Sequence, residues 1–157
     1  MKKIIFFFFL SALPLCVNAQ KVFNLVIQSA DRTISDPNSS YAMTQMAQFK
    51  KTALVYLRNK AFETQPEVKE AFLDEQEYYL SEFISLYVNE LLKTKELTKK
   101  EQKEKVKMFM QASSSNPLFN DTNTEVSESF IISGNELTPF SLDTDWEKAF
   151  AAAKANS

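Results

Sequence analysis

The chain has 157 residues and a formal net charge of −2, and it contains one cysteine, one glycine and no histidine. Without histidine, the catalytic triads and dyads that use it as the base are excluded, and zinc, copper and haem sites are not expected. A single glycine excludes a glycine-rich phosphate loop and disfavours a protein with many tight turns, so the composition predicts an all-α fold.

Residues 1–19 have the parts of a bacterial secretory signal peptide. A basic start, Met1-Lys2-Lys3, precedes an apolar run over residues 4–15, and Val17-Asn18-Ala19 supplies the small or modest residues that a signal peptidase accepts. We expect cleavage between Ala19 and Gln20. The processed protein is therefore predicted to act in the periplasm or outside the cell.

Two other interpretations of this segment are less favoured. A retained transmembrane anchor would need about 20 apolar residues, whereas this run is shorter and contains Pro14. Lipidation at Cys16 would place Leu15 where lipoprotein signals have Gly, Ala or Ser. We therefore expect no stable membrane span in the chain after cleavage.

Cleavage changes the composition of the protein. It leaves 16 basic residues against 20 acidic ones and no cysteine, because Lys2, Lys3 and Cys16 lie in the removed segment. Without disulfides, the fold depends on its own hydrophobic core. Residues 20–157 suffice for one such core and are too few to favour two domains. We predict a single all-helical domain, an irregular bundle of five to six helices.

In chain order, the first two helices are predicted at 22–33 and 40–61. Residues 22–33 fit a helix or a strand, and a helix is favoured because no partner strand is evident. Residues 36–39, Asp-Pro-Asn-Ser, form a turn. Ser39 or Ser40 is the expected N-cap of the second helix, whose apolar residues recur at three- and four-residue steps.

Four later positions carry the capping-box pattern Thr-x-x-Glu. Each precedes a stretch with helical periodicity, and together they predict helices at 65–92, 99–113, 123–133 and 145–155, with Pro66 in the first turn of the earliest one. The helix at 65–92 is predicted to be central, because its second half is apolar on more than one face. The boxes are Thr64/Glu67, Thr98/Glu101, Thr122/Glu125 and Thr144/Glu147.

The aromatic residues that remain after cleavage are expected mainly in the core, since a buried ring contributes about 2–3 kcal/mol. A groove for a partner is the alternative use of such residues. One segment is expected to differ from the rest. Residues 137–142 are predicted to form an extended strap that leads to Trp146 and holds the last helix on the bundle.

Charge is distributed in blocks along the chain. Residues 63–90 hold eight acids and one lysine, residues 93–107 hold seven lysines and three glutamates, and residues 121–147 hold seven acids and no base. The lysines could contact anionic lipid headgroups, nucleic acid or polyanionic glycans. We favour an intramolecular role, in which lysine stems cover the seam with an acidic helix. Nucleic acid is not expected for an acidic chain with Arg32 and Arg58 as its only arginines.

Two acidic segments are candidate cation sites. Residues 120–125 place oxygen-bearing side chains in succession, but an EF-hand loop counted from Asp121 would need Gly at its sixth position and Glu at its twelfth, where Val126 and Ile132 stand. Asp143 and Asp145 offer a second pair of ligands. Helix capping explains both segments and is favoured over calcium binding.

A carboxylate pair could support glycoside hydrolysis without histidine or cysteine. The candidates are Asp74, Glu75 and Glu77, with Tyr78 and Tyr79 available for stacking on a sugar. Neighbouring helical residues point to different faces, so we do not expect these acids to converge. No catalytic, cofactor-binding or metal-ligating residue is assigned.

Residues 97–102, Leu-Thr-Lys-Lys-Glu-Gln, resemble the Leu-Thr-x-x-Gln motif of the Spy-like periplasmic chaperones, with Glu101 where that family has Gln. The resemblance implies a small, secreted, all-helical chaperone. The residues themselves favour a non-enzymatic binding protein whose partner is a protein, a peptide or an envelope component. A carboxylate-based glycan hydrolase is the third hypothesis.

Overall fold

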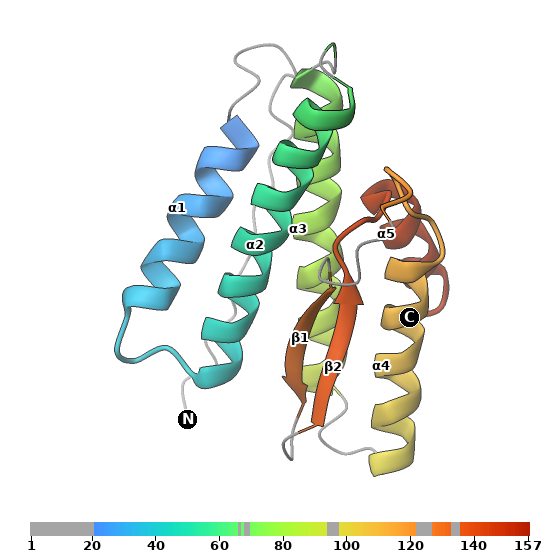
Figure 1. Ribbon diagram of the computed structural model, residues 1–157. Coiled ribbons are helices and arrows are strands. Elements are labelled where there is room, and N and C mark those ends of the chain that lie inside the picture. The colour runs from blue at the N-terminus through green and yellow to red at the C-terminus, as the bar shows by residue number, and fades with distance from the viewer. Residues whose placement is uncertain (1–20, 66, 68–69, 94–97, 122–126, 133–135) are drawn as a thin grey trace.

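The computed structural model describes residues 21–65, 67, 70–93, 98–121, 127–132 and 136–157 (Figure 1). These residues form a mostly helical protein, which confirms the all-α prediction, with one small hairpin in addition. The helices are α1 (Lys21–Ser35), α2 (Tyr41–Thr64), α3 (Glu70–Lys93), α4 (Lys99–Ser114) and α5 (Trp146–Ala155), and the strands are β1 (Ser127–Ile132) and β2 (Glu136–Ser141).

Helices α1 and α2 lie side by side and are joined by a short turn (Figure 1). In this turn the carboxylate of Asp36 accepts the backbone N–H of Asn38 at 2.9 Å, and the hydroxyl of Ser40 accepts the N–H of Met43 at 3.3 Å as the N-cap of α2. The helical prediction for residues 22–33 and the Ser40 cap are therefore confirmed. An ion pair of 2.6 Å between Asp31 and Lys51 also joins the two helices.

The predicted capping box at Thr64/Glu67 is wrong, because Thr64 is the last residue of α2. Its hydroxyl donates to the carbonyl of Lys60 at 2.7 Å, and α3 begins only at Glu70. The residue before a proline is pushed out of the helical region, and Gln65, which precedes Pro66, has φ −139° and ψ 73°. The proline thus ends one helix, whereas we expected it to open the next.

Of the capping boxes predicted after residue 90, one is confirmed and one is shifted by a residue. Thr98 and Glu101 form the predicted capping box at the start of α4. At α5 the cap is shifted by one residue, since the carboxylate of Asp145 accepts the N–H of Lys148 at 3.2 Å while the hydroxyl of Thr144 donates to the carbonyl of Ser113. The Thr122/Glu125 box lies outside the described residues.

The helix predicted at 123–133 is wrong, because β1 and β2 form an antiparallel pair in which Phe130 stands opposite Thr138. A helix over 123–133 would have had a face of only three apolar residues, Val126, Phe130 and Ile131. The run Phe130-Ile131-Ile132 fits a strand equally well, since β-branched and aromatic residues are enriched there. Pro139 has no N–H to donate, and it is tolerated because both strands of a two-stranded sheet are edges. The extended strap predicted at 137–142 is confirmed by β2.

The hairpin lies between α2 and α4, with β1 against α2 and β2 against α4 (Figure 1). An aromatic cluster beneath it forms the core. The ring centroid of Trp146 lies 5.5 Å from that of Phe83 and 6.4 Å from that of Phe49. Phe140 of β2 is 5.9 Å from Phe49, and Phe109 of α4 is 5.5 Å from Phe83. Four helices and the hairpin thus meet in tilted and edge-to-face ring contacts.

Candidate functional site: the lysine face of α4

The first turn of α4 is fixed by its capping box. The backbone N–H and the hydroxyl of Thr98 both donate to the carboxylate of Glu101, at 2.8 and 2.7 Å. These hydrogen bonds from the hydroxyl and the backbone N–H lower the pKa of Glu101 and keep it ionised. The carboxylate of Glu101 is therefore committed to the cap, and the geometry of the residues that follow is set by a regular helix.

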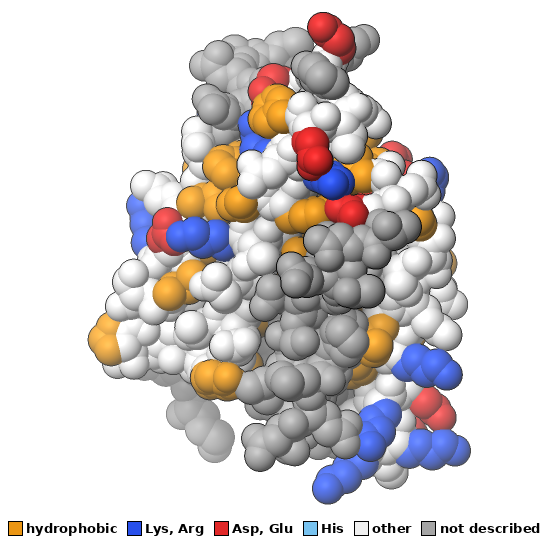
Figure 2. Space-filling model, viewed as in Figure 1, with side chains coloured by type: hydrophobic (Ala, Val, Ile, Leu, Met, Phe, Trp, Pro, Cys, Tyr) orange, Lys and Arg blue, Asp and Glu red, His pale blue; other side chains and the backbone are white. Residues whose placement is uncertain are grey.

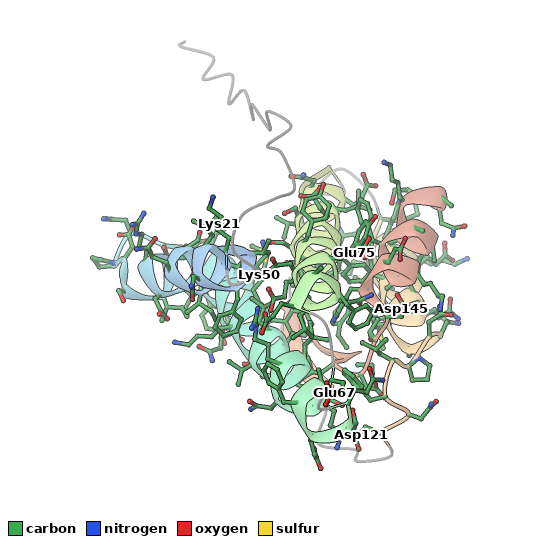
Figure 3. The ribbon with its side chains drawn as sticks, turned by 90° about the horizontal axis from the view of Figure 1, so that it is seen from above. Lys21, Lys50, Glu67, Glu75, Asp121 and Asp145 are labelled. Atoms are coloured by element: carbon green, nitrogen blue, oxygen red, sulfur yellow. The ribbon has the colours of Figure 1, made fainter. Side chains whose placement is uncertain are left out.

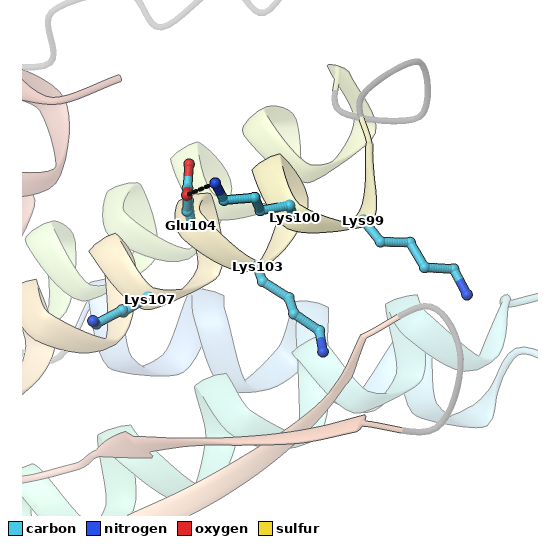
Figure 4. Close-up of a pocket in the computed structure, with 5 residues that line it drawn as sticks. All are labelled: Lys99, Lys100, Lys103, Glu104 and Lys107. Atoms are coloured by element: carbon cyan, nitrogen blue, oxygen red, sulfur yellow. Dashed lines mark ion pairs between the residues drawn. The ribbon is translucent and has the colours of Figure 1, made fainter.

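Lys99, Lys103 and Lys107 follow one another at four-residue intervals along α4, and we call them the lysine face. Residues four apart share one side of a helix. All three side chains are exposed. With Lys100 and Glu104 they line a depression of about 370 Å³ (Figure 4). Basic side chains gather at the lower right of Figure 2, where α4 begins in the same view of Figure 1.

Two other lysines of α4 are used within the protein. Lys105 is half-buried and forms an ion pair of 2.9 Å with Glu90 of α3. Lys100 lies 3.9 Å from Glu104 on the same helix, and Figure 4 shows Lys99 and Lys103 pointing away from this pair. The predicted seam between an acidic and a basic helix is confirmed for Lys105.

The lysine face opposes the stability of its own helix. The N-terminal end of a helix carries a partial positive charge, so a cation there costs about 0.3–1 kcal/mol. Lys99 and Lys100 are the first two residues of α4. Like charges four residues apart cost a further 0.2–0.5 kcal/mol or so per pair, and the lysine face contains two such pairs, Lys99–Lys103 and Lys103–Lys107. A helix selected for stability alone would carry an acid at its N-terminal end and would not repeat one charge at four-residue intervals.

A second charged cluster, around Arg58 of α2, is buried. The Nε atom of Arg58 donates to Glu77 at 2.5 Å and its Nη1 atom donates to Glu70 at 3.3 Å, while its guanidinium lies 4.7 Å from the ring centroid of Phe23. Glu77 is fully buried, and burial raises its pKa even though Arg58 acts in the opposite direction. Burial also raises the pKa of Asp74, one turn away. The cluster ties α1, α2 and α3 together.

The prediction that Asp74, Glu75 and Glu77 lie on separate faces needs correction. Asp74 and Glu77 are three residues apart and both face Arg58, whereas Glu75 is exposed on the side of α3 nearer α5 (Figure 3). Arg58 was not among the predicted site residues. The available signal was an arginine placed among the apolar residues of the helix predicted at 40–61. Because Glu77 is fully buried and bound by Arg58, the pair is not presented to a substrate.

Of the two tyrosines considered for sugar stacking, Tyr79 packs against the core and Tyr78 is exposed. The rings of Tyr78 and Tyr79 are 5.4 Å apart, and Tyr79 lies 5.9 Å from Phe150 of α5. Tyr79 and Phe150 are half-buried, and 40% of Tyr78 is exposed. These rings mainly join α3 to α5.

The acidic residues considered as cation ligands instead accept hydrogen bonds from the protein. The carboxylate of Asp143 accepts the backbone N–H groups of Leu118, Phe119 and Asp121, at 2.9, 2.7 and 2.7 Å. Asp121 accepts the Tyr56 hydroxyl at 3.1 Å beside α2, whereas Asp145 lies at the start of α5 (Figure 3). Within the described ranges, no group of three or more potential metal ligands was found. The part of the 120–125 segment beyond Asp121 lies outside these ranges.

None of the helices that the structure describes is both long and apolar enough to cross a membrane. Comparisons with protein-family models, with curated proteins and with solved structures found no match to this chain.

Proposed function

We propose that this chain is exported by a bacterial signal peptide and acts in the periplasm or outside the cell as a non-enzymatic binding protein. Its lysine face binds an anionic partner, which is an acidic protein, an acidic peptide or an envelope component. The pattern of residues 1–19 supports the export. The binding is supported by one observation above all: three exposed lysines follow one another at four-residue intervals along α4, where their like charges repel.

The export is tested by cell fractionation and mass spectrometry of the full chain. Phe7→Asp with Phe8→Asp interrupts the apolar run that the export machinery would recognise. We expect the wild type outside the cytoplasm, beginning at Gln20, and the variant inside at full length. Recovery of an unprocessed wild type from the cytoplasm would contradict the proposal.

The binding is tested by retaining components of an envelope extract on the immobilised processed protein. Lys99→Gln, Lys103→Gln and Lys107→Gln together remove the charge of the lysine face. The matched control removes the same charge at exposed Lys21, Lys148 and Lys154. We expect a component that the wild type and the control retain and the lysine-face variant loses. Equal retention by all three proteins would show that the lysine face is not the binding site.

The chaperone hypothesis has less support than the proposed function. The residues that resemble the Spy-like motif include Thr98 and Glu101, whose capping box gives them a structural role. Large exposed apolar side chains are spread over separate helices, among them Leu25 on α1, Phe62 on α2 and Tyr78 on α3. A holdase would suppress the aggregation of an unfolded client at near-stoichiometric protein, and the proposed function predicts no such effect.

A further inference from the structure

The chemistry of the lysine face narrows the kind of anion that it would bind. Its charged residues are lysines, and none of the described residues that line the depression is an arginine. An arginine fork recognises a single phosphate or carboxylate by two parallel hydrogen bonds, whereas an ammonium group is a flexible and strongly hydrated point charge. A row of exposed lysines therefore suits a surface with many negative charges better than one small anion held in a fixed geometry.

The shape of the lysine face is extended. Four residues of helix rise about 6 Å, so the backbone positions of Lys99 and Lys107 are separated by about 12 Å along α4. The opposite side of the helix is buried, since Val106, Phe109 and Ala112 belong to the core. The apolar side of α4 is thus occupied, and the helix has no free apolar face to insert among acyl chains. Contact with a membrane would be made by the charged side chains alone.

The distribution of charge determines that α4 is the part of the protein that would face an anionic surface. The processed protein as a whole is acidic, with 16 basic residues against 20 acidic ones. At physiological ionic strength, charges farther away than about 8 Å are largely screened. Lys99, Lys100, Lys103 and Lys107 outnumber the two exposed acids of α4, Glu101 and Glu104. An anionic surface against α4 is therefore attracted by the nearby lysines and only weakly repelled by acids elsewhere in the protein. Glu104, which also lines the depression, is paired with Lys100.

We infer that the lysine face of α4 docks on a bilayer surface rich in anionic phospholipid, with the helix lying along the headgroups. The inference rests on the proposed function and names the class of envelope component. Attraction of a basic residue to an anionic membrane is about 1 kcal/mol. The lysine face should therefore increase partitioning on the order of 100-fold, which is about 3 kcal/mol at 1.4 kcal/mol per tenfold.

The experiment is co-sedimentation of the processed protein with vesicles, after expression of the full chain. Phosphatidylglycerol vesicles are compared with phosphatidylcholine vesicles at low and high salt, using the wild type, the triple Lys→Gln variant of the lysine face and the control at Lys21, Lys148 and Lys154. All three proteins carry the same residues 1–19, so any residual signal segment contributes equally. Circular dichroism establishes that each variant is folded.

We expect the wild type and the control to bind phosphatidylglycerol and not phosphatidylcholine, with binding lost at high salt and reduced roughly 100-fold in the lysine-face variant. Equal binding by the two variants would overturn the inference, as would an absence of binding to either vesicle. Competition arms use inorganic phosphate and polyphosphate. Displacement by millimolar inorganic phosphate would identify a site for a single anion and overturn docking on a bilayer. If vesicle binding fails while the lysine-dependent envelope component is still retained, the proposed function stands and its partner is not lipid.

Discussion

Arg58 and Glu77 illustrate how strongly two buried residues can depend on each other. Glu77 is fully buried and bound by the guanidinium. Arg58→Met would leave the carboxylate without its cation, and the loss of one member of a buried ion pair costs about 3–5 kcal/mol. We expect urea unfolding near neutral pH to show a destabilisation of this size. The double variant Arg58→Met/Glu77→Met should recover most of the stability, because no charge then remains buried.

The stability of the single variant Arg58→Met depends on pH. Burial already raises the pKa of Glu77 above its ordinary value of 4.5, and removal of Arg58 raises it further. The folded state then retains a proton that the unfolded state has lost, so stability falls as the pH rises from about 4.5 through the folded-state pKa. The destabilisation by Arg58→Met should be larger near pH 8 than near pH 5. An equal loss at both pH values would exclude this explanation.

Asp143 stabilises a loop through its charge. Its carboxylate accepts three backbone N–H groups from residues 118–121. Asp143→Asn keeps the shape but replaces one acceptor oxygen with a donor, and hydrogen bonds to charged groups contribute about 1.5–3 kcal/mol each. We expect a loss of at least 2 kcal/mol or so in unfolding free energy. The control is Asp36→Asn, whose carboxylate caps an exposed turn and should cost less than about 1 kcal/mol.

At the scale of the element, α4 is a helix whose first residues have the wrong charge for its dipole. Lys99→Glu should raise the free energy of unfolding by about 0.5–1.5 kcal/mol, since it removes a repulsion and adds an attraction at the N-terminal end. Lys107→Glu lies two turns further on and should gain less. Thermal or urea unfolding at low salt checks the difference between the two, which should shrink at high salt. A loss of stability in Lys99→Glu would contradict the electrostatic argument.

Several elements could be predicted because their local signals agree with the packing. Helix α2 has a cap, a periodic apolar stripe and a preceding turn. The prediction of a helix and not a strand for residues 22–33 is confirmed by α1. The hairpin could not be predicted, because its short apolar run fits both periods and the choice between them depends on packing against α2 and α4. The end of α2 was misplaced for a different reason. Thr64 and Pro66 are compatible with either the end of one helix or the start of another.

At the scale of the whole molecule, the charge blocks of the sequence acquire distinct uses. Acids at 70 and 77 are bound by Arg58, Asp143 and Asp145 organise the approach to α5, and Lys105 pairs with Glu90. The sequence alone could show that 93–107 is basic. It could not show which lysines lie in the seam and which are exposed, because that depends on the rotation of α4 against α3. In the structure, Lys105 lies half-buried beside Glu90, whereas Lys99, Lys103 and Lys107 are exposed.

We expect the lysine face to reduce the stability of the protein and to be retained for binding. Unfolding free energy of the triple variant Lys99→Gln/Lys103→Gln/Lys107→Gln, determined on the same sample that is assayed for retention of the envelope component, tests this claim most directly. We expect the unfolding free energy of the variant to exceed that of the wild type by about 0.5–1 kcal/mol, and we expect the variant no longer to retain the envelope component. A variant that is less stable than the wild type, or one that binds as well as the wild type, would contradict it.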